Sequence, residues 1–456
     1  MSDNNDSKPH SKIQLKQIKS SLFERTISVA KMGLNAGLKY AAHKATGQDF
    51  DQYVTDQAES MTKELGQLKG SLMKAGQMLS MYGEYFFPPQ ANEYLKKLQA
   101  DSPPVEWAQM KSYLETYLDA ELIDELDINP ISVGSASMGQ VHQAVIKATG
   151  EKIALKIQYP LLENAIDSDL KSLKVLLQFS KLIPSEINLD SVFEEIKSML
   201  TQELDYSLEA ELTEKYRLLV GDDPRFIVPQ VYFKYSTSKV LATKYIDGLK
   251  ADHPLVQSLS QNRRNRLSEN FIDLYFKELF SWNLVQTDPH LGNYKVQIDS
   301  LGEDRLVLLD FGACRSFPEA FMQSYKKMIK GSIVGDRDLF FTGAKGLCFI
   351  IDTDKSDYIE AFTTFCDETV EPFWTAADSR NTAGKVDTDG RYQWAKTDLP
   401  SRVVKKAIQF KNFDLRTPPK DILFLDRKTG GVFIFLSVLK AHINARKVID
   451  SYLKTV

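Results

Sequence analysis

The residues of this sequence best suited to chemistry gather in two short motifs, at positions 286–293 (Q-T-D-P-H-L-G-N) and 308–312 (L-L-D-F-G). The first motif carries a carboxylate, Asp288, five residues before a carboxamide, Asn293, and the second places Asp310 at the end of an apolar run. Hard cations such as Mg²⁺ prefer oxygen ligands, and phosphoryl transfer needs a carboxylate beside the attacking oxygen. We therefore expect Asn293 and Asp310 to hold magnesium with a bound triphosphate, and Asp288 to act as the base or to orient water.

The order and spacing of these residues are those of protein kinases, in which a D-x-x-x-x-N catalytic loop precedes a D-F-G motif. The His-Arg pair that precedes the catalytic aspartate in those enzymes is missing, and Gln286 and Thr287 stand in its place. D-F-G alone matches by chance too easily to carry an interpretation. The two motifs in this order, flanked by strand-like apolar runs, indicate a nucleotide site.

Upstream of these motifs, the pattern of apolar residues changes from that of helices to that of strands. One of these strands carries a candidate phosphate-binding lysine. Residues 131–146 and 152–157, separated by a Thr149-Gly150 turn, are expected to form three short strands. Lys156 on the third strand would reach the α- and β-phosphates of ATP. Between the first two strands lie small residues whose backbone N–H groups can face phosphate oxygens: Gly134, Ser135, Ala136, Ser137, Met138 and Gly139.

A phosphate-binding lysine needs a carboxylate partner, and the segment 201–211 supplies Glu203, Asp205 and Glu209. Asp205 and Glu209 are four residues apart, so they would share a helix face if this segment is helical at both positions. The alternative is an acidic face that is simply solvated. The distance from Lys156 is unusual for a protein kinase, because apolar-periodic helical stretches at 161–182 and 189–199 lie in between.

The rest of the chain fits a small sheet followed by a helical region. Residues 228–232 and 239–246 are predicted to continue the sheet, and Asp247-Gly248 ends it. Amphipathic patterns predict helices at 104–122, at 263–282, which leads into the Asp288 loop, and at 431–453. A polar loop is predicted at 376–390.

Composition narrows the class of protein. A chain of 456 residues suggests a large bilobal domain with an N-terminal extension rather than one compact core. The net charge of −4 gives no reason to expect nucleic acid as a partner. Three cysteines without a C-x-x-C pattern encode neither a disulfide framework nor a zinc site, which indicates a reducing, cytoplasmic compartment. No apolar run reaches about 18 residues, so any membrane contact is expected to be peripheral.

The N-terminal region leaves two alternatives open. Residues 28–45 predict a helix that carries Gly33, Gly37 and three lysines, and this helix either packs on the protein itself or lies on a membrane surface. Residues 53–81 predict a second helix with a leucine stripe. Its opposite face carries Lys74 and Gln77 beside glycines, so Lys74 is either one more solvated lysine or part of a closely packed contact.

Together these residues resemble one family, the UbiB (AarF) family of protein-kinase-like proteins linked to ubiquinone biosynthesis. The resemblance extends from about residue 66 to residue 440. It rests on six motifs in one order: Lys74-Ala-Gly-Gln77, Ala136-Ser-Met-Gly-Gln-Val-His142, Leu155-Lys156, Glu203-Leu-Asp205 with Glu209, Asp288-Pro-His-Leu-Gly-Asn293 and Asp310-Phe-Gly312.

The resemblance implies an α+β, bilobal, protein-kinase-like fold, with a small antiparallel-sheet N-lobe, a helical C-lobe and an N-terminal helical extension packed over the nucleotide cleft. It implies that Lys74 faces Glu203, that Lys74, Gln77, Glu203 and Asp205 regulate access, and that Glu209 holds Lys156. It also implies an ATPase or small-molecule kinase rather than an ordinary protein kinase.

Two departures from the family pattern affect the nucleotide site. The phosphate loop begins with Gly134-Ser135, where the family usually has alanines, and Thr243-Lys244 replaces the usual Met-Glu-like pair at the hinge. Because backbone groups normally hold adenine there, Lys244 bears on nucleotide selectivity more than on binding. Some family members also carry C-terminal membrane spans, which this sequence does not show.

The sequence therefore predicts four regions: a disordered tail (1–25), a helical extension with the K-x-G-Q motif (26–125), a kinase-like N-lobe with a helical insertion (126–248) and a helical C-lobe (249–456). The predicted function is an atypical kinase or ATPase that uses ATP and Mg²⁺ and supports isoprenoid quinone synthesis or lipid homeostasis. The expected partners are ATP or ADP, quinone-biosynthesis proteins and a peripheral lipid surface at the inner face of the membrane, without nucleic acid. The alternative is a pseudokinase scaffold that switches shape on nucleotide binding without turnover.

Overall fold

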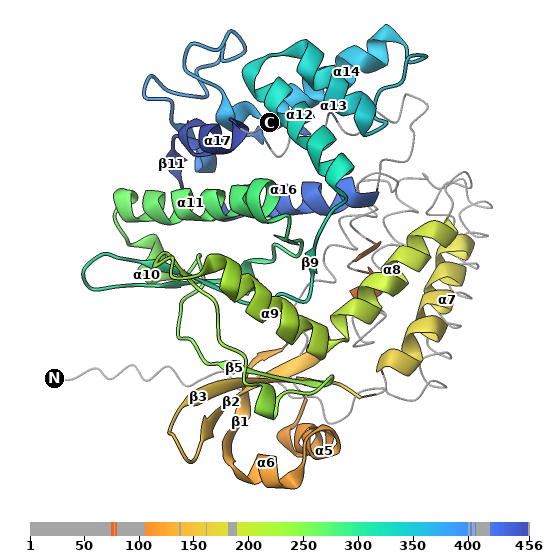
Figure 1. The fold of residues 1–456 in the computed structure, drawn as a ribbon, viewed down its shortest axis with the longest axis vertical. Helices are drawn as coiled ribbons and strands as arrows, with labels where there is room; N and C mark the ends of the chain where they lie inside the picture. Colours follow the sequence, from red (N-terminus) through yellow and green to blue (C-terminus); the bar gives the residue numbers. More distant parts are fainter. Residues whose placement is uncertain are drawn as a thin grey trace, which may run out of the picture. The chain divides into compact units, whose positions relative to one another are not determined.

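A computed structural model describes residues 74–76, 78–79, 105–135, 138–160, 162–180, 189–399, 402–403, 406 and 420–454 (Figure 1). The chain divides into two compact units. The N-terminal unit comprises Met1–Glu211 and Gln230–Tyr245, and the C-terminal unit comprises Leu212–Pro229 and Ile246–Val456. The predicted regions 1–25 and 28–45 lie outside the described residues, as does all but a few residues of 53–81.

The N-terminal unit contains an antiparallel sheet with the strand order β1-β2-β3-β5. Its strands are β1 (Leu126–Ser135), β2 (Gly139–Ile146), β3 (Lys152–Gln158) and β5 (Val240–Lys244). Burial alternates along β2 and β3, as the period of a half-buried strand requires. The three predicted strands are thus confirmed, although β1 starts five residues earlier and its register shifts around Pro130, which has no N–H for the ladder.

The prediction that residues 228–232 continue the sheet is confirmed only for the second half of the segment. Val231 forms an antiparallel bridge with Thr243 of β5, and the Tyr232 N–H donates to the Ala242 carbonyl oxygen at 2.8 Å. The neighbouring β4 (Phe226–Ile227) pairs instead with β8 (Arg305–Leu308) in the C-terminal unit. Pro229 explains the interruption, because proline cannot donate a ladder hydrogen bond.

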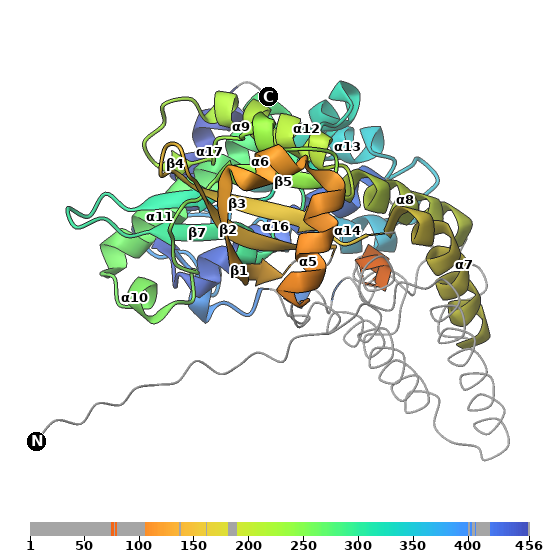
Figure 2. The same cartoon turned by 90° about the horizontal axis from the view of Figure 1, so that it is seen from below.

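The described helices of the N-terminal unit include α5 (Trp107–Tyr117), which packs against β3, and α6 (Ala120–Asp124) (Figure 2). They replace the single helix predicted over 104–122, because Leu118 adopts an extended conformation between them. The predicted insertion is confirmed as α7 (Leu162–Ser180) and α8 (Leu189–Glu203), which pack side by side. The next helix, α9 (Tyr206–Val220), contains the boundary between the units.

In the C-terminal unit, α11 (Gln261–Phe276) continues into a π-helical turn, η2 (Lys277–Trp282), and runs beside α16 (Lys420–Val438) (Figure 1). The single helix predicted over 431–453 is wrong. The chain leaves α16, passes Lys440 in a left-handed conformation (φ 53°), forms β11 (His442–Ile443) and only then begins α17 (Ala445–Leu453). Other α-helices of the C-terminal unit are α10 (Pro254–Gln257), α12 (Glu319–Val334), α13 (Arg337–Gly346) and α14 (Ser356–Thr369).

Short strands carry the two sequence motifs of the C-terminal unit. The strand β7 (Tyr294–Gln297) follows Asn293 and pairs antiparallel with β8, which precedes Asp310. The strand β6 (Val285–Gln286) precedes Asp288 and pairs with β9 (Cys314–Arg315), which follows the D-F-G motif. These two pairings bring the catalytic-loop motif and the D-F-G motif next to each other.

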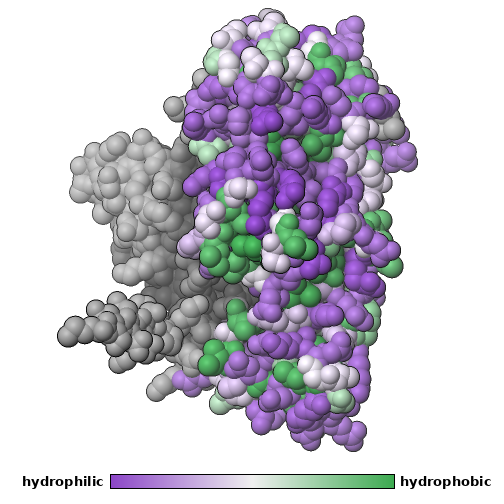
Figure 3. All heavy atoms as spheres, turned by 90° about the vertical axis from the view of Figure 1, so that its left-hand side faces the viewer, coloured by the Kyte–Doolittle hydropathy of each residue, from purple (hydrophilic) through white to green (hydrophobic). Residues whose placement is uncertain are grey.

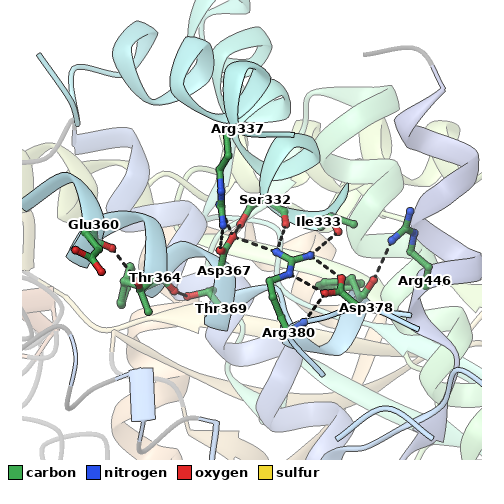
Figure 4. A network of polar contacts seen from close by, with 12 residues as sticks. Ser332, Ile333, Arg337, Glu360, Thr364, Asp367, Thr369, Asp378, Arg380 and Arg446 are labelled. Carbon is green, nitrogen blue, oxygen red and sulfur yellow. Dashed lines mark hydrogen bonds and ion pairs between the residues drawn. The ribbon is translucent and has the colours of Figure 1, made fainter. Parts of the chain in front are cut away.

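A polar network ties the predicted polar loop to the helices of the C-terminal unit (Figure 4). The Arg380 guanidinium donates to the carbonyl oxygens of Ser332 and Ile333 in the last turn of α12, at 2.6 and 3.0 Å. It also forms ion pairs with Asp378 and Asp367. Asp367 forms a second ion pair, with Arg337, at 2.6 Å. The network therefore satisfies helix-end carbonyl groups that would otherwise lack partners.

One face of the described residues is mainly polar. Figure 3 shows one face on which hydrophilic residues predominate and hydrophobic residues form small separate areas. No helix in the described part of the chain is both long enough and apolar enough to cross a membrane.

Candidate functional site

In the N-terminal unit, Lys156 on β3 forms an ion pair with Glu209 in the first turn of α9. The Lys156 Nζ lies 2.8 Å from both carboxylate oxygens, and the Glu209 side chain is only 3% exposed. The same ammonium lies 4.9 Å from the centre of the Tyr206 ring. A buried carboxylate that binds the lysine through both oxygens fixes the direction of the ammonium, which is what a phosphate-binding lysine requires.

The small-residue loop predicted to face phosphate is described only in part. Gly134 and Ser135 end β1, the buried Met138 precedes β2, and Ala136 and Ser137 lie outside the described residues. Gly139 cannot carry a side chain, because a Cβ there would lie 2.7 Å from the Ile157 carbonyl oxygen. This close approach explains one glycine of the loop by strand packing rather than by ligand binding.

Two other residues of the same motif, Gln140 and His142, hold the sheet together. The Gln140 amide exchanges hydrogen bonds with the backbone of Val105, at 2.8 and 3.1 Å, and its Nε2 donates to His142 Nε2 at 3.0 Å. His142 Nδ1 then donates to the Asn129 carbonyl oxygen at 2.9 Å. Burial lowers the pKa of His142, which agrees with this neutral tautomer.

The residues that the family resemblance makes regulatory lie in the same unit. Lys74 and Glu203 form an ion pair at 2.7 Å, as the resemblance implies, and Gln77 lies outside the described residues. The condition for a helix face shared by Asp205 and Glu209 is not met, because α9 begins after Asp205. Asp205 instead caps that helix: its Oδ1 accepts the Leu208 N–H at 3.1 Å.

The hinge residue Lys244 is exposed at the end of β5. Its N–H donates to the Gln230 carbonyl oxygen at 2.8 Å, and the Tyr245 N–H donates to the Lys152 carbonyl oxygen at 3.0 Å. Both N–H groups are therefore already used within the sheet.

In the C-terminal unit, the backbone brings Asp288, Asn293 and Asp310 together. Asn293 Nδ2 donates to the Asp288 carbonyl oxygen at 2.9 Å, and the Asn293 carbonyl oxygen accepts the N–H of Leu309 at 2.8 Å. Asp310 adopts a left-handed conformation with φ of 64°. Non-glycine residues in this conformation are uncommon and gather at functional sites.

Gln286 joins these two motifs. Its buried side chain donates through Nε2 to the carbonyl oxygens of Asp288, at 2.7 Å, and Asp310, at 3.3 Å. Its Oε1 accepts a hydrogen bond from the Tyr294 hydroxyl at 2.7 Å. The glutamine that replaces the kinase His-Arg pair therefore fixes the backbone of both carboxylates. The sequence analysis noted the replacement without predicting this role.

A buried ion pair holds the backbone N–H of Gln286. Glu278 and Lys428 lie 2.7 Å apart with only 1% of each side chain exposed. Glu278 also accepts hydrogen bonds from the Tyr216 hydroxyl at 2.7 Å and from the Gln286 N–H at 3.3 Å. Burial raises the pKa of Glu278, while Lys428 opposes that shift. Glu278 belongs to the π-helical turn η2, a local irregularity often found at functional sites.

Sequence reasoning missed two residues of α16 that contact this site. Arg427 forms an ion pair with Asp288 at 2.5 Å, and Lys428 pairs with Glu278. The sequence did contain a sign of this contact. Two adjacent basic residues, followed by Gly430 and Gly431, interrupt a mainly apolar stretch.

The oxygen atoms present suit magnesium. Because Asn293 Nδ2 donates to the Asp288 backbone, the amide oxygen is the atom that can face a cation, and Asp310 supplies a carboxylate. Within the described residues, no three or more His, Cys, Asp or Glu side chains form a group that could hold a metal ion. Two protein ligands are compatible with Mg²⁺, which usually keeps waters and binds substrate phosphates.

A family model described as the ABC1 atypical kinase-like domain matches residues 97–341, which is more than half of the chain. The chain belongs to this atypical kinase-like family. The UbiB resemblance is thus confirmed, and so is the expected α+β kinase-like fold. A solved structure, the Rv3197–erythromycin complex from Mycobacterium tuberculosis, has a similar fold, with a TM-score of 0.56 and 24% identity over 87% of this chain and 95% of that one.

Curated relatives include atypical kinases named as mitochondrial. The chain is 30% identical to COQ8B of Rattus norvegicus over 87% of its own length and 72% of that protein. It is 27% identical to COQ8 of Saccharomyces cerevisiae, over 94% of its own length and 83% of the yeast protein. It spans 61% of COQ8B of Danio rerio, to which it is 30% identical over 87% of this chain.

Proposed function

We propose that this protein is an atypical kinase or ATPase that uses magnesium and ATP. The observation that carries the proposal is the ion pair in which the buried Glu209 holds Lys156 through both carboxylate oxygens. A lysine that must meet phosphate oxygens is held in this way by a carboxylate in protein kinases. Family membership supports the same chemistry.

The chain's own residues divide the work. Lys156 binds phosphate oxygens, Asn293 and Asp310 hold the metal, and Asp288 orients the attacking hydroxyl or water. Magnesium, when bound, neutralises charge on the phosphates. Gln286 fixes the backbone of Asp288 relative to that of Asp310, because its side chain donates a hydrogen bond to each carbonyl oxygen. Pre-organisation of this kind is the main source of rate in phosphoryl transfer.

For the cellular role we propose support of isoprenoid quinone synthesis or lipid homeostasis, as the family resemblance implies. Quinone-biosynthesis proteins and a lipid surface, reached through residues 28–45, would be the partners. Co-sedimentation with anionic liposomes that is unaffected by deletion of residues 1–50 would exclude this segment as the membrane contact. We propose a cytoplasmic location for this chain, with any lipid contact at the inner face of the membrane.

One observation favours the alternative of a nucleotide-switched scaffold. Lys74, which the family resemblance makes regulatory, is paired with Glu203 at 2.7 Å. A regulatory ion pair that changes when nucleotide binds would serve a scaffold that switches shape without turnover. A steady-state assay of ATP hydrolysis, combined with measurement of nucleotide retained on the protein, separates the two functions. Continuous Mg²⁺-dependent phosphate release supports the enzyme, whereas about one ATP bound per chain without release supports the scaffold.

A further inference from the structure

The helix α16 presents a short segment, residues 427–431, to the loop that carries Asp288. Arg427 Nη2 lies 2.5 Å from Asp288 Oδ1, although the two residues are 139 positions apart in sequence. The next residue, Lys428, binds Glu278, which in turn accepts the N–H of Gln286. Consecutive residues of α16 therefore reach both the side chain of the candidate catalytic residue and the support of its backbone.

The contact between α16 and this loop is also close. A Cβ on Gly431 would lie 2.2 Å from the Cβ of Pro289, the residue after Asp288. Such a distance is far below van der Waals contact, so only glycine fits at this position. The backbone of α16 at Gly431 and the ring of Pro289 are thus in direct contact one helical turn from Arg427.

We infer that Arg427 is a positioning residue for phosphoryl transfer, which acts by holding the Asp288 carboxylate in one orientation. The inference rests on the proposed function. A guanidinium bonded to a carboxylate makes a charge-assisted hydrogen bond, which is short and directional. With Asp288 Oδ1 fixed from α16 and the Asp288 carbonyl oxygen fixed by Gln286, both ends of the residue are held.

The exposure of this pair separates a positioning role from a purely structural one. The side chains of Arg427 and Asp288 are 26% and 18% exposed, so the pair lies between a surface pair and a fully buried one. Loss of Arg427 should therefore lower the melting temperature by less than loss of the fully buried Lys428 does. A misplaced catalytic group, by contrast, lowers turnover by up to about 100-fold.

Arg446 provides a matched control. It lies on α17, is 21% exposed, pairs with Asp450 at 2.6 Å and lies beside Asp378 in the network of Figure 4. Its contacts within the described residues involve no candidate site residue. The experiment compares Arg427→Gln, Arg427→Lys, Arg446→Gln and Asp288→Asn in the full chain. The readouts are kcat and KM for Mg-ATP hydrolysis, nucleotide affinity and melting temperature.

The inference predicts that Arg427→Gln lowers kcat by about 10-fold to 100-fold, with KM and nucleotide affinity within about 3-fold of wild type. Arg427→Lys should retain an intermediate kcat, and Arg446→Gln should match wild type. The double variant Arg427→Gln with Asp288→Asn should be no slower than Asp288→Asn alone, because the two residues act as one unit.

Several outcomes would overturn the inference. If wild type turns over ATP and Asp288→Asn does not, a wild-type or increased kcat for Arg427→Gln rejects the positioning role and leaves the proposed function standing. If wild type shows no turnover at all, the proposed function fails and the inference fails with it. If Arg427→Gln does not fold, a folded Arg427→Lys with unchanged kcat and unchanged KM still rejects the role.

Discussion

Lys156 and Glu209 lie 53 positions apart in sequence, yet the lysine ammonium is within 2.8 Å of both glutamate oxygens. The helices α7 and α8 lie between the two residues in the sequence, and the ion pair forms despite this insertion. We predict that Lys156→Met weakens Mg-ATP binding by about 10-fold to 100-fold, because a hydrogen bond to a charged group contributes about 1.5–3 kcal/mol. Isothermal titration calorimetry measures the change.

The control for this prediction is Lys152→Met, which removes an exposed lysine from the same strand. Its ATP affinity should equal that of wild type. Equal Mg-ATP affinities of wild type and Lys156→Met would show that Lys156 does not bind the nucleotide.

The buried pair of Glu278 and Lys428 leads to a prediction about stability. Lys428→Met should lower the free energy of unfolding by about 3–5 kcal/mol, because it leaves a buried carboxylate without its partner. The double variant Lys428→Met with Glu278→Leu should recover only part of that loss, because it removes the unpaired charge but leaves the Tyr216 hydroxyl and the Gln286 N–H without their acceptor. Urea denaturation measures both values, and a single variant as stable as wild type would show that the pair does not stabilise the fold.

A third prediction concerns pH. Hydrogen bonds from Arg225, and then from Lys277, hold the pKa of Asp223 well below its ordinary value. Folding thus favours the charged carboxylate, so its stabilising contribution is present above the unfolded-state pKa of about 3.9 and is lost as the pH falls through the lower folded-state value. Asp223→Asn should cost about 1 kcal/mol at pH 7 and less at pH 3.

Thermal denaturation of wild type, Asp223→Asn and the exposed neighbour variant Asp222→Asn at both pH values tests this. The Asp222 variant should follow wild type. A gap between wild type and Asp223→Asn that is as large at pH 3 as at pH 7 would contradict the assignment.

The pair of Lys74 and Glu203 tests whether the K-x-G-Q helix regulates activity. If the pair controls access to nucleotide, Lys74→Ala and Glu203→Ala should change the ratio of ADP to ATP affinity, or release self-phosphorylation, while the protein stays folded. Melting temperature, both affinities and incorporation of labelled phosphate are the measurements. Two variants that are merely destabilised, with every activity reduced together, would mean that the pair is structural.

The sequence was informative where one residue type has one chemical use within a motif. Lys156, Asn293 and Asp310 were predicted on that basis, whereas the pairing of Glu209 with Lys156, across 53 positions, followed from the family resemblance. Arg427 was not found, because its partner lies 139 residues away and only the packing of α16 brings them together. Tertiary contacts of this kind leave no periodic pattern in the sequence.

The errors in secondary structure have local physical causes. Pro229 removes a donor from the segment predicted as a strand. Lys440 takes a left-handed conformation that ends α16, although the apolar pattern continues through residues 442–453. Asp205 caps α9 instead of joining its face, since short acidic side chains compete for free N–H groups at helix starts.

The central claim, that this chain uses a magnesium-bound nucleotide, is tested most directly by thermal stabilisation of wild type and Asp310→Asn. Asparagine tolerates the left-handed conformation of this position, so the substitution should leave the fold and the nucleotide-free melting temperature unchanged. The account predicts that Mg-ATP at about 100 times its Kd stabilises wild type by about 2.7 kcal/mol and that Asp310→Asn loses this stabilisation, whereas equal stabilisation of both proteins by Mg-ATP would contradict it.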